Sequence, residues 1–204
     1  MIRFFAVLAL LVLAFAPLTA QDAAQNPPPP AGDQSALSAS PYKNGDQAIS
    51  LSASAVFPLA VLPSPTGTSG LNIVGAGFGF SYRYFLDHQW AVGGSIGGAF
   101  NSTIALRSLF TAPLAAEVSY WMALVPFEFV FEGGLGGYLM RLENNGMVGP
   151  FAKIGASALW RTGSGWSVGL KTEGWVVPEL HIAYPDFNRT GLLLETGLVA
   201  VYHL

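Results

Sequence analysis

Apolar residues occupy every second position over much of the chain from residue 47 onward. Between Ile49 and Phe57 they alternate with serines, and between Val74 and Tyr82 they alternate with glycines and a serine. This period of two places successive side chains on opposite faces of a β-strand, whereas a helical face repeats every 3.6 residues. The pattern predicts eight strands, each with one apolar face. The six later alternating segments are residues 90–96, 110–120, 127–139, 154–160, 166–176 and 192–202.

A membrane-spanning helix is the main competing interpretation of the first apolar stretch. Residues 47–82 carry no charge, and about 20 apolar residues are enough for a helix to cross a bilayer. However, Pro58, Pro63 and Pro65 interrupt the stretch, and the turn-forming residues 66–70 follow them. Because proline removes a helical hydrogen bond and glycine and serine favour turns, two strands joined by a turn fit this stretch better than a helix does.

The charged residues inside the predicted strands all fall on the face opposite the apolar one. An Arg or Lys facing lipid at the bilayer midplane costs about 2–4 kcal/mol, so charges in a membrane barrel belong in its lumen. The parity therefore predicts an all-β fold, an eight-stranded antiparallel transmembrane β-barrel built as an up-and-down meander. The predicted lumenal charge network consists of Arg83, Glu117, Glu128, Glu132, Lys153, Lys171, Glu173 and Glu195. We expect these charges to pair, with Lys153, Glu173 and Glu195 at similar heights and Lys171 lower.

Aromatic residues flank alternate connections, where they would lie at one rim of the barrel. Such rings of aromatic side chains mark the membrane interface in outer-membrane barrels. The predicted interfacial aromatic girdle consists of Tyr84, Trp90, Tyr120, Phe127, Trp160, Trp166 and Tyr202. The connections on this side, near 86–89, 122–126 and 162–165, are short, which is typical of periplasmic turns. Longer connections are expected near 60–70, 101–107, 142–147 and 178–190.

The segment before the barrel has the features of an export signal and a linker. Arg3, an apolar run and the small residues before Gln21 predict a cleaved signal peptide over residues 1–20. Residues 21–45 contain four consecutive prolines and many polar residues, which predicts a disordered periplasmic leader. The barrel itself is expected to occupy residues 46–204.

The composition supports a membrane barrel and excludes several other classes of protein. Hydrophobic residues make up 51% of the chain and charged residues only 10%, whereas about 25% charged is usual for soluble domains. The net charge of -3 gives no basic surface for nucleic acid. The chain has no cysteine, which excludes disulfides, thiolate metal sites and a cysteine nucleophile. We expect neither a cofactor nor a metal site.

The last strand, residues 195–204, together with the alternation and the girdle, resembles the OmpA-, OmpX- and OmpW-like small outer-membrane β-barrels. In that superfamily the final strand carries an assembly signal with a glycine and a terminal aromatic. Gly197 and Tyr202 match this signal, while Leu204 stands in place of the terminal aromatic. The resemblance implies a monomer in the outer membrane, with membrane lipid and the barrel-assembly machinery as its partners.

The candidate chemistry of the chain is sparse. Its histidines, His88, His181 and His203, are expected to be solvated, and none is flanked by a serine arrangement that would suggest a hydrolase. We therefore predict that the protein is not an enzyme and has no catalytic residue. The last outer loop is a candidate surface for an unknown extracellular partner, through His181, Tyr184, Asp186, Phe187 and Arg189.

Two hypotheses for the function follow from the barrel. An eight-stranded barrel is filled by its own side chains or holds one small ligand. In the first hypothesis, salt bridges close the lumen and the protein has a structural or surface-interaction role. In the second, it is a narrow OmpW-like conduit for small hydrophobic molecules. Glycines on the predicted inner face at 75, 77, 79, 93, 97, 134 and 136 either make room for Tyr138, Phe151, Leu159 and Trp175 or outline a cavity.

Overall fold

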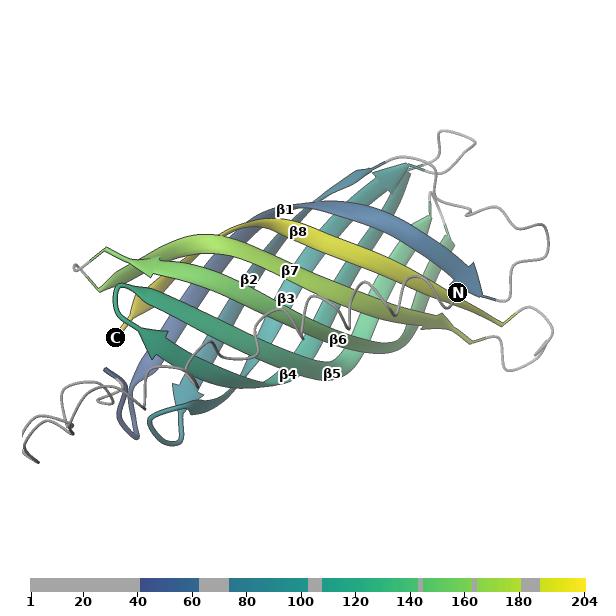
Figure 1. Ribbon diagram of the computed structural model, residues 1–204. Helices are drawn as coiled ribbons and strands as arrows, with labels where there is room; N and C mark the ends of the chain where they lie inside the picture. Colours follow the sequence, from purple (N-terminus) through teal and green to yellow (C-terminus); the bar gives the residue numbers. More distant parts are fainter. Residues whose placement is uncertain (1–40, 63–73, 103–107, 143–144, 163–164, 181–187) are drawn as a thin grey trace, which may run out of the picture. The chain divides into compact units, whose positions relative to one another are not determined.

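The computed structural model describes residues 41–62, 74–102, 108–142, 145–162, 165–180 and 188–204. Within these ranges the chain forms eight antiparallel β-strands that close into a barrel (Figure 1). The predicted fold class, an eight-stranded up-and-down barrel, is confirmed. The predicted signal peptide and residues 21–40 of the predicted leader lie outside the described residues.

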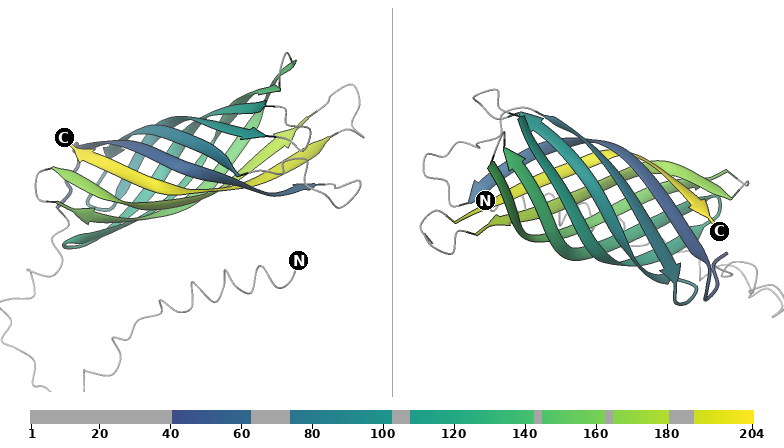
Figure 2. Two further views of the ribbon diagram at one scale, coloured as in Figure 1. Left: turned by 90° about the horizontal axis from the view of Figure 1, so that it is seen from above. Right: turned by 180° about the vertical axis from the view of Figure 1, so that it is seen from behind.

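Each strand pairs with its neighbours in sequence, and the first strand pairs with the last to close the barrel. Ile49 lies opposite Tyr202 across this closing pair. The strands slant around the barrel axis in every view, as closure of a sheet requires (Figure 2). The strands are β1 (Gln47–Leu62), β2 (Gly75–Phe85), β3 (Trp90–Ser102), β4 (Ser108–Leu124), β5 (Phe127–Leu142), β6 (Asn145–Arg161), β7 (Trp166–Glu179) and β8 (Arg189–His203).

The two ends of the barrel differ. The start of β1, the end of β8 and the β2–β3, β4–β5 and β6–β7 turns share one end, which we call the terminal end. The opposite end is called the loop end. The β5–β6 connection there is shorter than expected, because the strands pair up to Leu142 and Asn145 and leave only residues 143–144 between them. The predicted longer loop at 142–147 is therefore wrong, because β6 begins at Asn145 and its backbone pairs with β5 along this stretch.

The outer face of the barrel is apolar, as the alternation predicts. Leu135 and Ile154 are 71% and 73% exposed, and Leu114, Leu170 and Leu198 are also largely exposed. A soluble protein would bury side chains of this size, so the surface fits a hydrocarbon environment. In the described ranges, no helix is both long enough and apolar enough to cross a membrane.

Two apolar clusters fill the interior of the barrel. The cluster near the terminal end includes Phe85, Trp121 and Leu159. The cluster nearer the loop end includes Tyr138, Phe151 and Trp175. Each cluster contains three aromatic side chains among smaller apolar ones, and each buried ring removes a large apolar area from water. The clusters leave a band between them that is occupied by charged residues.

Candidate functional site: the lumenal charge layer

A layer of seven charged side chains lies between the two apolar clusters. Along β4 the inward residues run from Trp121 of one cluster through Glu117 to Ala115 of the other, and β8 repeats this order with Glu195 in the middle. All these side chains point inward because they occupy the face opposite the lipid-facing residues. We call this set the charge layer: Arg83, Glu117, Glu132, Lys153, Lys171, Glu173 and Glu195.

Six members of the charge layer form a closed ring in which positive and negative groups alternate. Arg83 contacts Glu117 at 3.4 Å and pairs closely with Glu132. Lys153 pairs closely with Glu117 and lies 3.0 Å from Glu173. Lys171 completes the ring, because its Nζ lies 2.9 Å from Glu173 and 3.9 Å from Glu132. Each cation therefore lies between two carboxylates, and each carboxylate lies between two cations.

Glu195 lies outside the ring. Its Oε1 accepts a hydrogen bond of 2.6 Å from the Ser54 hydroxyl on β1. Among the described residues, no Lys, Arg or His nitrogen forms an ion pair with it within 4.0 Å. Its neighbour across the β7–β8 pair is Glu173, at the same height in the barrel. The expected pairing of Glu195 with a lysine is therefore not what the structure contains.

Aromatic side chains cover the charge layer on both sides. The Arg83 guanidinium lies over the Trp121 ring, 5.9 Å from its centroid. On the side of the loop end, the Trp175 Nε1–H donates a hydrogen bond of 3.1 Å to Glu173, and Phe151 packs edge-on against Trp175. The layer is thus enclosed by groups that also satisfy some of its polar atoms, as buried charges require.

Glu128 was predicted to belong to the same network, but it forms a separate group near the terminal end. Its carboxylate accepts hydrogen bonds from the Tyr42 hydroxyl at 2.7 Å and the Ser167 hydroxyl at 2.9 Å. Arg161 donates to the same carboxylate at 3.2 Å. The sequence interpretation missed Arg161, although its position next to the outward-facing Trp160 indicates an inward direction. We call this group, with His203, the terminal cluster.

Tyr42 shows that the predicted leader ends earlier than residue 45. Its side chain is only 3% exposed and stacks on Phe85, with ring centroids 4.3 Å apart. Burial and the neighbouring Glu128 carboxylate raise the pKa of the Tyr42 phenol, so it remains a hydrogen-bond donor to Glu128. Tyr42 is therefore part of the barrel interior, and the Gly45 N–H, which donates a hydrogen bond of 3.0 Å to the Phe85 carbonyl oxygen, holds the exposed residues 43–45 at the terminal end.

The histidines do not all behave as expected. His203 is expected from the sequence to be solvated, yet its Nε2 lies 2.9 Å from the Ser167 hydroxyl and 3.7 Å from Glu128. His88 is exposed in the β2–β3 turn, and its Nδ1 lies 2.6 Å from the Tyr42 carbonyl oxygen. His181 lies outside the described residues.

The contact between Ser167 and His203 lacks the geometry of a hydrolase. Ser167 has no exposed surface, so a substrate cannot reach its hydroxyl. Glu128 accepts a hydrogen bond from Ser167 itself, whereas the acid of a catalytic triad binds the second nitrogen of the histidine. The group is arranged to hold the Glu128 carboxylate in place.

The β2–β3 turn at the terminal end is fixed by Asp87. Its Oδ1 accepts hydrogen bonds from the backbone N–H groups of Gln89 at 2.7 Å and Trp90 at 2.6 Å. These two bonds lower the pKa of the Asp87 carboxyl below its ordinary value. They also set the start of β3, where Trp90 faces outward.

The predicted aromatic girdle lies on the outer face near the terminal end. Trp90 packs against Tyr120 with ring centroids 5.1 Å apart, and Trp166 packs against Tyr202 at 4.9 Å. Phe127 and Trp160 lie opposite one another across the β5–β6 pair and are both exposed. Of the predicted surface loop, His181, Tyr184, Asp186 and Phe187 lie outside the described residues, while Arg189 begins β8.

The inner-face glycines make room for polar groups more than for the expected aromatic ones. A Cβ at Gly134 would lie 3.2 Å from Lys153 and 3.3 Å from Glu117, and one at Gly79 would lie 2.7 Å from the Ser52 hydroxyl. The space beside Tyr138 is left by Gly149, which the sequence interpretation did not select. Those predicted glycines therefore serve the packing of polar side chains, including two of the charge layer.

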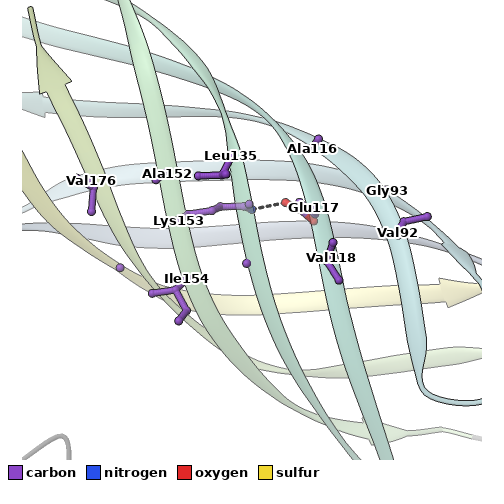
Figure 3. A pocket seen from close by; sticks show the side chains of 13 residues that line it. Val92, Gly93, Ala116, Glu117, Val118, Leu135, Ala152, Lys153, Ile154 and Val176 are labelled. Carbon is purple, nitrogen blue, oxygen red and sulfur yellow. Dashed lines mark ion pairs between the residues drawn. The ribbon is translucent and has the colours of Figure 1, made fainter.

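In the described part of the barrel, a void inside the lumen is much smaller than a groove on the outer wall. A void bordered by Glu173, Glu195 and Ser52 inside the lumen has a volume of about 20 Å³, which is enough for about one water molecule. A groove of about 710 Å³ lies instead along the wall over β3–β7, where Val118, Leu135 and Ile154 are exposed. Figure 3 shows this groove with the Lys153–Glu117 ion pair at it.

Comparison with known proteins agrees with this architecture. The structure is similar to that of Neisserial surface protein A (NspA), with a TM-score of 0.57, 9% sequence identity, and coverage of 77% of this chain and 94% of that one. It is also similar to the outer membrane protein OprG from Pseudomonas aeruginosa, with a TM-score of 0.50, 11% identity, and coverage of 80% and 97%. The chain has the fold of the small outer-membrane β-barrels. The predicted resemblance to OmpA-, OmpX- and OmpW-like proteins is confirmed at the level of this fold.

A comparison with protein-family models assigns the chain to a family. A protein-family model matches residues 25–202, and the chain belongs to that family. The match begins before β1 and includes all the strands except the last residue of β8. No curated protein sequence matches the chain. The function must therefore be argued from the interior and the surface of the barrel.

Proposed function

We propose that this protein is an integral outer-membrane barrel whose lumen is closed and whose role is structural or based on surface interactions, not catalytic. The location is supported by the exposed apolar outer face and by the aromatic residues near the terminal end. Such a surface is stable in lipid, and the terminal end then lies on the periplasmic side. Membrane lipid and the barrel-assembly machinery are the partners that this location implies.

The closed lumen is supported chiefly by one observation, the ring of alternating charges between two apolar clusters. Every cation of the ring contacts two carboxylates, so moving any one of them breaks two buried ion pairs. Removing one partner of a buried pair costs about 3–5 kcal/mol. The void of about 20 Å³ beside the ring is too small for a solute larger than a water molecule.

This interior favours the closed barrel over an OmpW-like conduit for small hydrophobic molecules. An apolar molecule crossing the lumen would have to displace the charge layer and both apolar clusters. Burial of charges against an apolar molecule is costly because it removes their polar partners. The surface-interaction part of the proposal concerns the loop end, where Arg189 is the described residue of the candidate loop.

Replacing one ring cation tests the proposal. Lys153→Met keeps an unbranched side chain, one atom shorter, but leaves Glu117 and Glu173 each short of one cation. We expect a loss of about 3–5 kcal/mol in the free energy of unfolding, measured by urea titration of the protein in lipid. We also expect faster leakage of a small ionic dye from proteoliposomes.

The matched control is Leu170→Val on the outer face, where Leu170 is 63% exposed. It should change neither stability nor leakage by much, because lipid replaces the lost contacts. Equal stability of Lys153→Met and Leu170→Val, together with rapid leakage through the unaltered protein, would contradict a lumen closed by the ring.

A further inference from the structure

We propose that Glu195 is a proton-binding site in the charge layer, where it is held as a neutral carboxylic acid at neutral pH and donates its proton to Glu173. This inference goes beyond the closed lumen, because it assigns a bound proton to one named side chain. It rests on the charge balance of the layer, on the hydrogen bonds that Glu173 accepts and on the direct pairing of Glu173 with Glu195 across β7 and β8.

The charge balance of the layer leaves Glu195 without a counter-ion. Three cations and three carboxylates complete the ring of alternating charges. Glu195 is a fourth carboxyl group, 3% exposed, outside that ring. An isolated ionised carboxylate in such a place is costly, and a buried group of this kind takes up a proton instead.

The partners of Glu173 show which of the two facing carboxyl groups is ionised. Glu173 Oε1 accepts from Lys153 at 3.0 Å and lies 2.9 Å from Lys171, and its Oε2 accepts from Trp175 at 3.1 Å. Three donors therefore stabilise its ionised form. The Glu195 carboxyl has the Ser54 hydroxyl as its donor and lies within hydrogen-bonding reach of Glu173.

The position of the two residues in the sheet adds a second reason. Glu173 and Glu195 are direct register partners on β7 and β8. Like charges directly opposite one another on neighbouring strands are destabilising. A proton on Glu195 converts this repulsion into a hydrogen bond in which the Glu195 O–H donates and the Glu173 carboxylate accepts.

The carboxyl groups on this side of the lumen lie close together. Glu132 is also within hydrogen-bonding reach of Glu173, and its buried Oε1 has no hydrogen-bond partner among the described residues. A proton on Glu195 lowers the negative charge that these three carboxyl groups share. The void of about 20 Å³ beside Glu195 has room for about one water molecule, through which a proton can reach it.

The ionisable groups around Glu195 come from five other strands. Glu173 and Lys171 face it from β7, while β1 contributes the uncharged Ser54. The remaining members of the charge layer lie across the lumen: Arg83 on β2, Glu117 on β4, Glu132 on β5 and Lys153 on β6. All of these are already paired within the ring, so the proton on Glu195 leaves the layer electrically neutral.

The bound proton makes stability depend on pH in a definite direction. The folded protein holds one proton that an unfolded glutamate releases at neutral pH. Because the folded state binds more protons, the free energy of unfolding falls as the pH rises. Once Glu195 loses its proton, the layer carries one unpaired negative charge, and the ring loosens.

Infrared spectroscopy and a conservative variant test the proposal in detergent-solubilised full-length protein. At neutral pH the spectrum should contain the carbonyl stretching band of one buried protonated carboxyl group. Glu195→Gln, whose amide replaces both the O–H donor and the acceptor of the neutral acid, should fold, lose this band and no longer lose stability between neutral and alkaline pH.

Glu132→Gln distinguishes this assignment from a proton on the neighbouring carboxyl group. If Glu195 holds the proton, Glu132→Gln should be destabilised at neutral pH, because Arg83 loses a ring partner, whereas Glu195→Gln should be about as stable as the unaltered protein. Absence of the band from the unaltered protein would overturn the proposal. So would its persistence in Glu195→Gln, or the opposite order of stability for the two variants.

Discussion

Tyr42 illustrates how a single side chain outside the strands takes part in the barrel. Its ring stacks on Phe85, contacts Trp121 edge-on and lies under the Arg161 guanidinium, while its hydroxyl binds Glu128. No local pattern predicts this role, because the residue lies in a polar, proline-rich segment with no strand alternation. Its burial depends on the shape of the barrel mouth, which exists only after the strands have closed.

Tyr42→Phe should separate the hydroxyl from the ring. The variant keeps the stacking on Phe85 but removes one donor to the buried Glu128 carboxylate, so we expect a loss of about 1.5–3 kcal/mol in the free energy of unfolding. Tyr82→Phe, which removes a hydroxyl from the outer face, is the control and should have little effect. Equal urea midpoints for the two variants would contradict the role of the Tyr42 hydroxyl.

For the charged residues, alternation along a strand predicts the face on which a side chain lies but not the partner that it meets. The side on which each charge lies follows from the period of two, and the structure has the charge layer in the lumen. Which charges meet depends on the stagger of the strands and on contacts across the lumen. For this reason the sequence interpretation anticipated Glu173 beside Glu195, but not the pairing of Lys153 with Glu117 from β4 or the separation of Glu128.

At the scale of the strands, alternation predicted each element but not its full length. β4, β5 and β6 extend beyond their apolar segments, and β5 and β6 pair as far as Leu142 and Asn145. Backbone pairing continues where side chains no longer alternate clearly, because each added pair satisfies N–H and C=O groups. Strand ends at the loop end are therefore set by hydrogen bonding more than by hydrophobicity.

The glycines of β6 provide a test of the packing inside the barrel. A Cβ at Gly155 would lie 2.5 Å from Glu173 Cγ and 2.8 Å from the Thr172 carbonyl oxygen, whereas a Cβ at Gly146 meets nothing within 4 Å. Gly155→Val should lower the free energy of unfolding by about 1–3 kcal/mol through overpacking against the ring. Gly146→Val on the same strand is the control. A similar loss at both sites would mean that strand propensity, not lumenal space, decides the outcome.

At the scale of the whole molecule, the central claim is that the barrel is an outer-membrane protein with a closed lumen. The even number of strands, the meander order and the closure of β1 on β8 all followed from the sequence pattern. A lumen closed by salt bridges was one of two hypotheses that the sequence left open, because the contacts that would close it come from a ring of charges and two apolar clusters assembled from many strands. The interior therefore has to be tested on the intact, folded protein.

Single-channel recording in planar lipid bilayers tests this claim most directly. The unaltered protein should insert without producing a steady, ion-selective conductance, because the charge layer and both apolar clusters obstruct the lumen. Lys153→Met should produce brief, irregular openings, since two ring carboxylates lose a cation. A stable conductance from the unaltered protein, unchanged by Lys153→Met, would contradict the closed barrel and would favour a conduit.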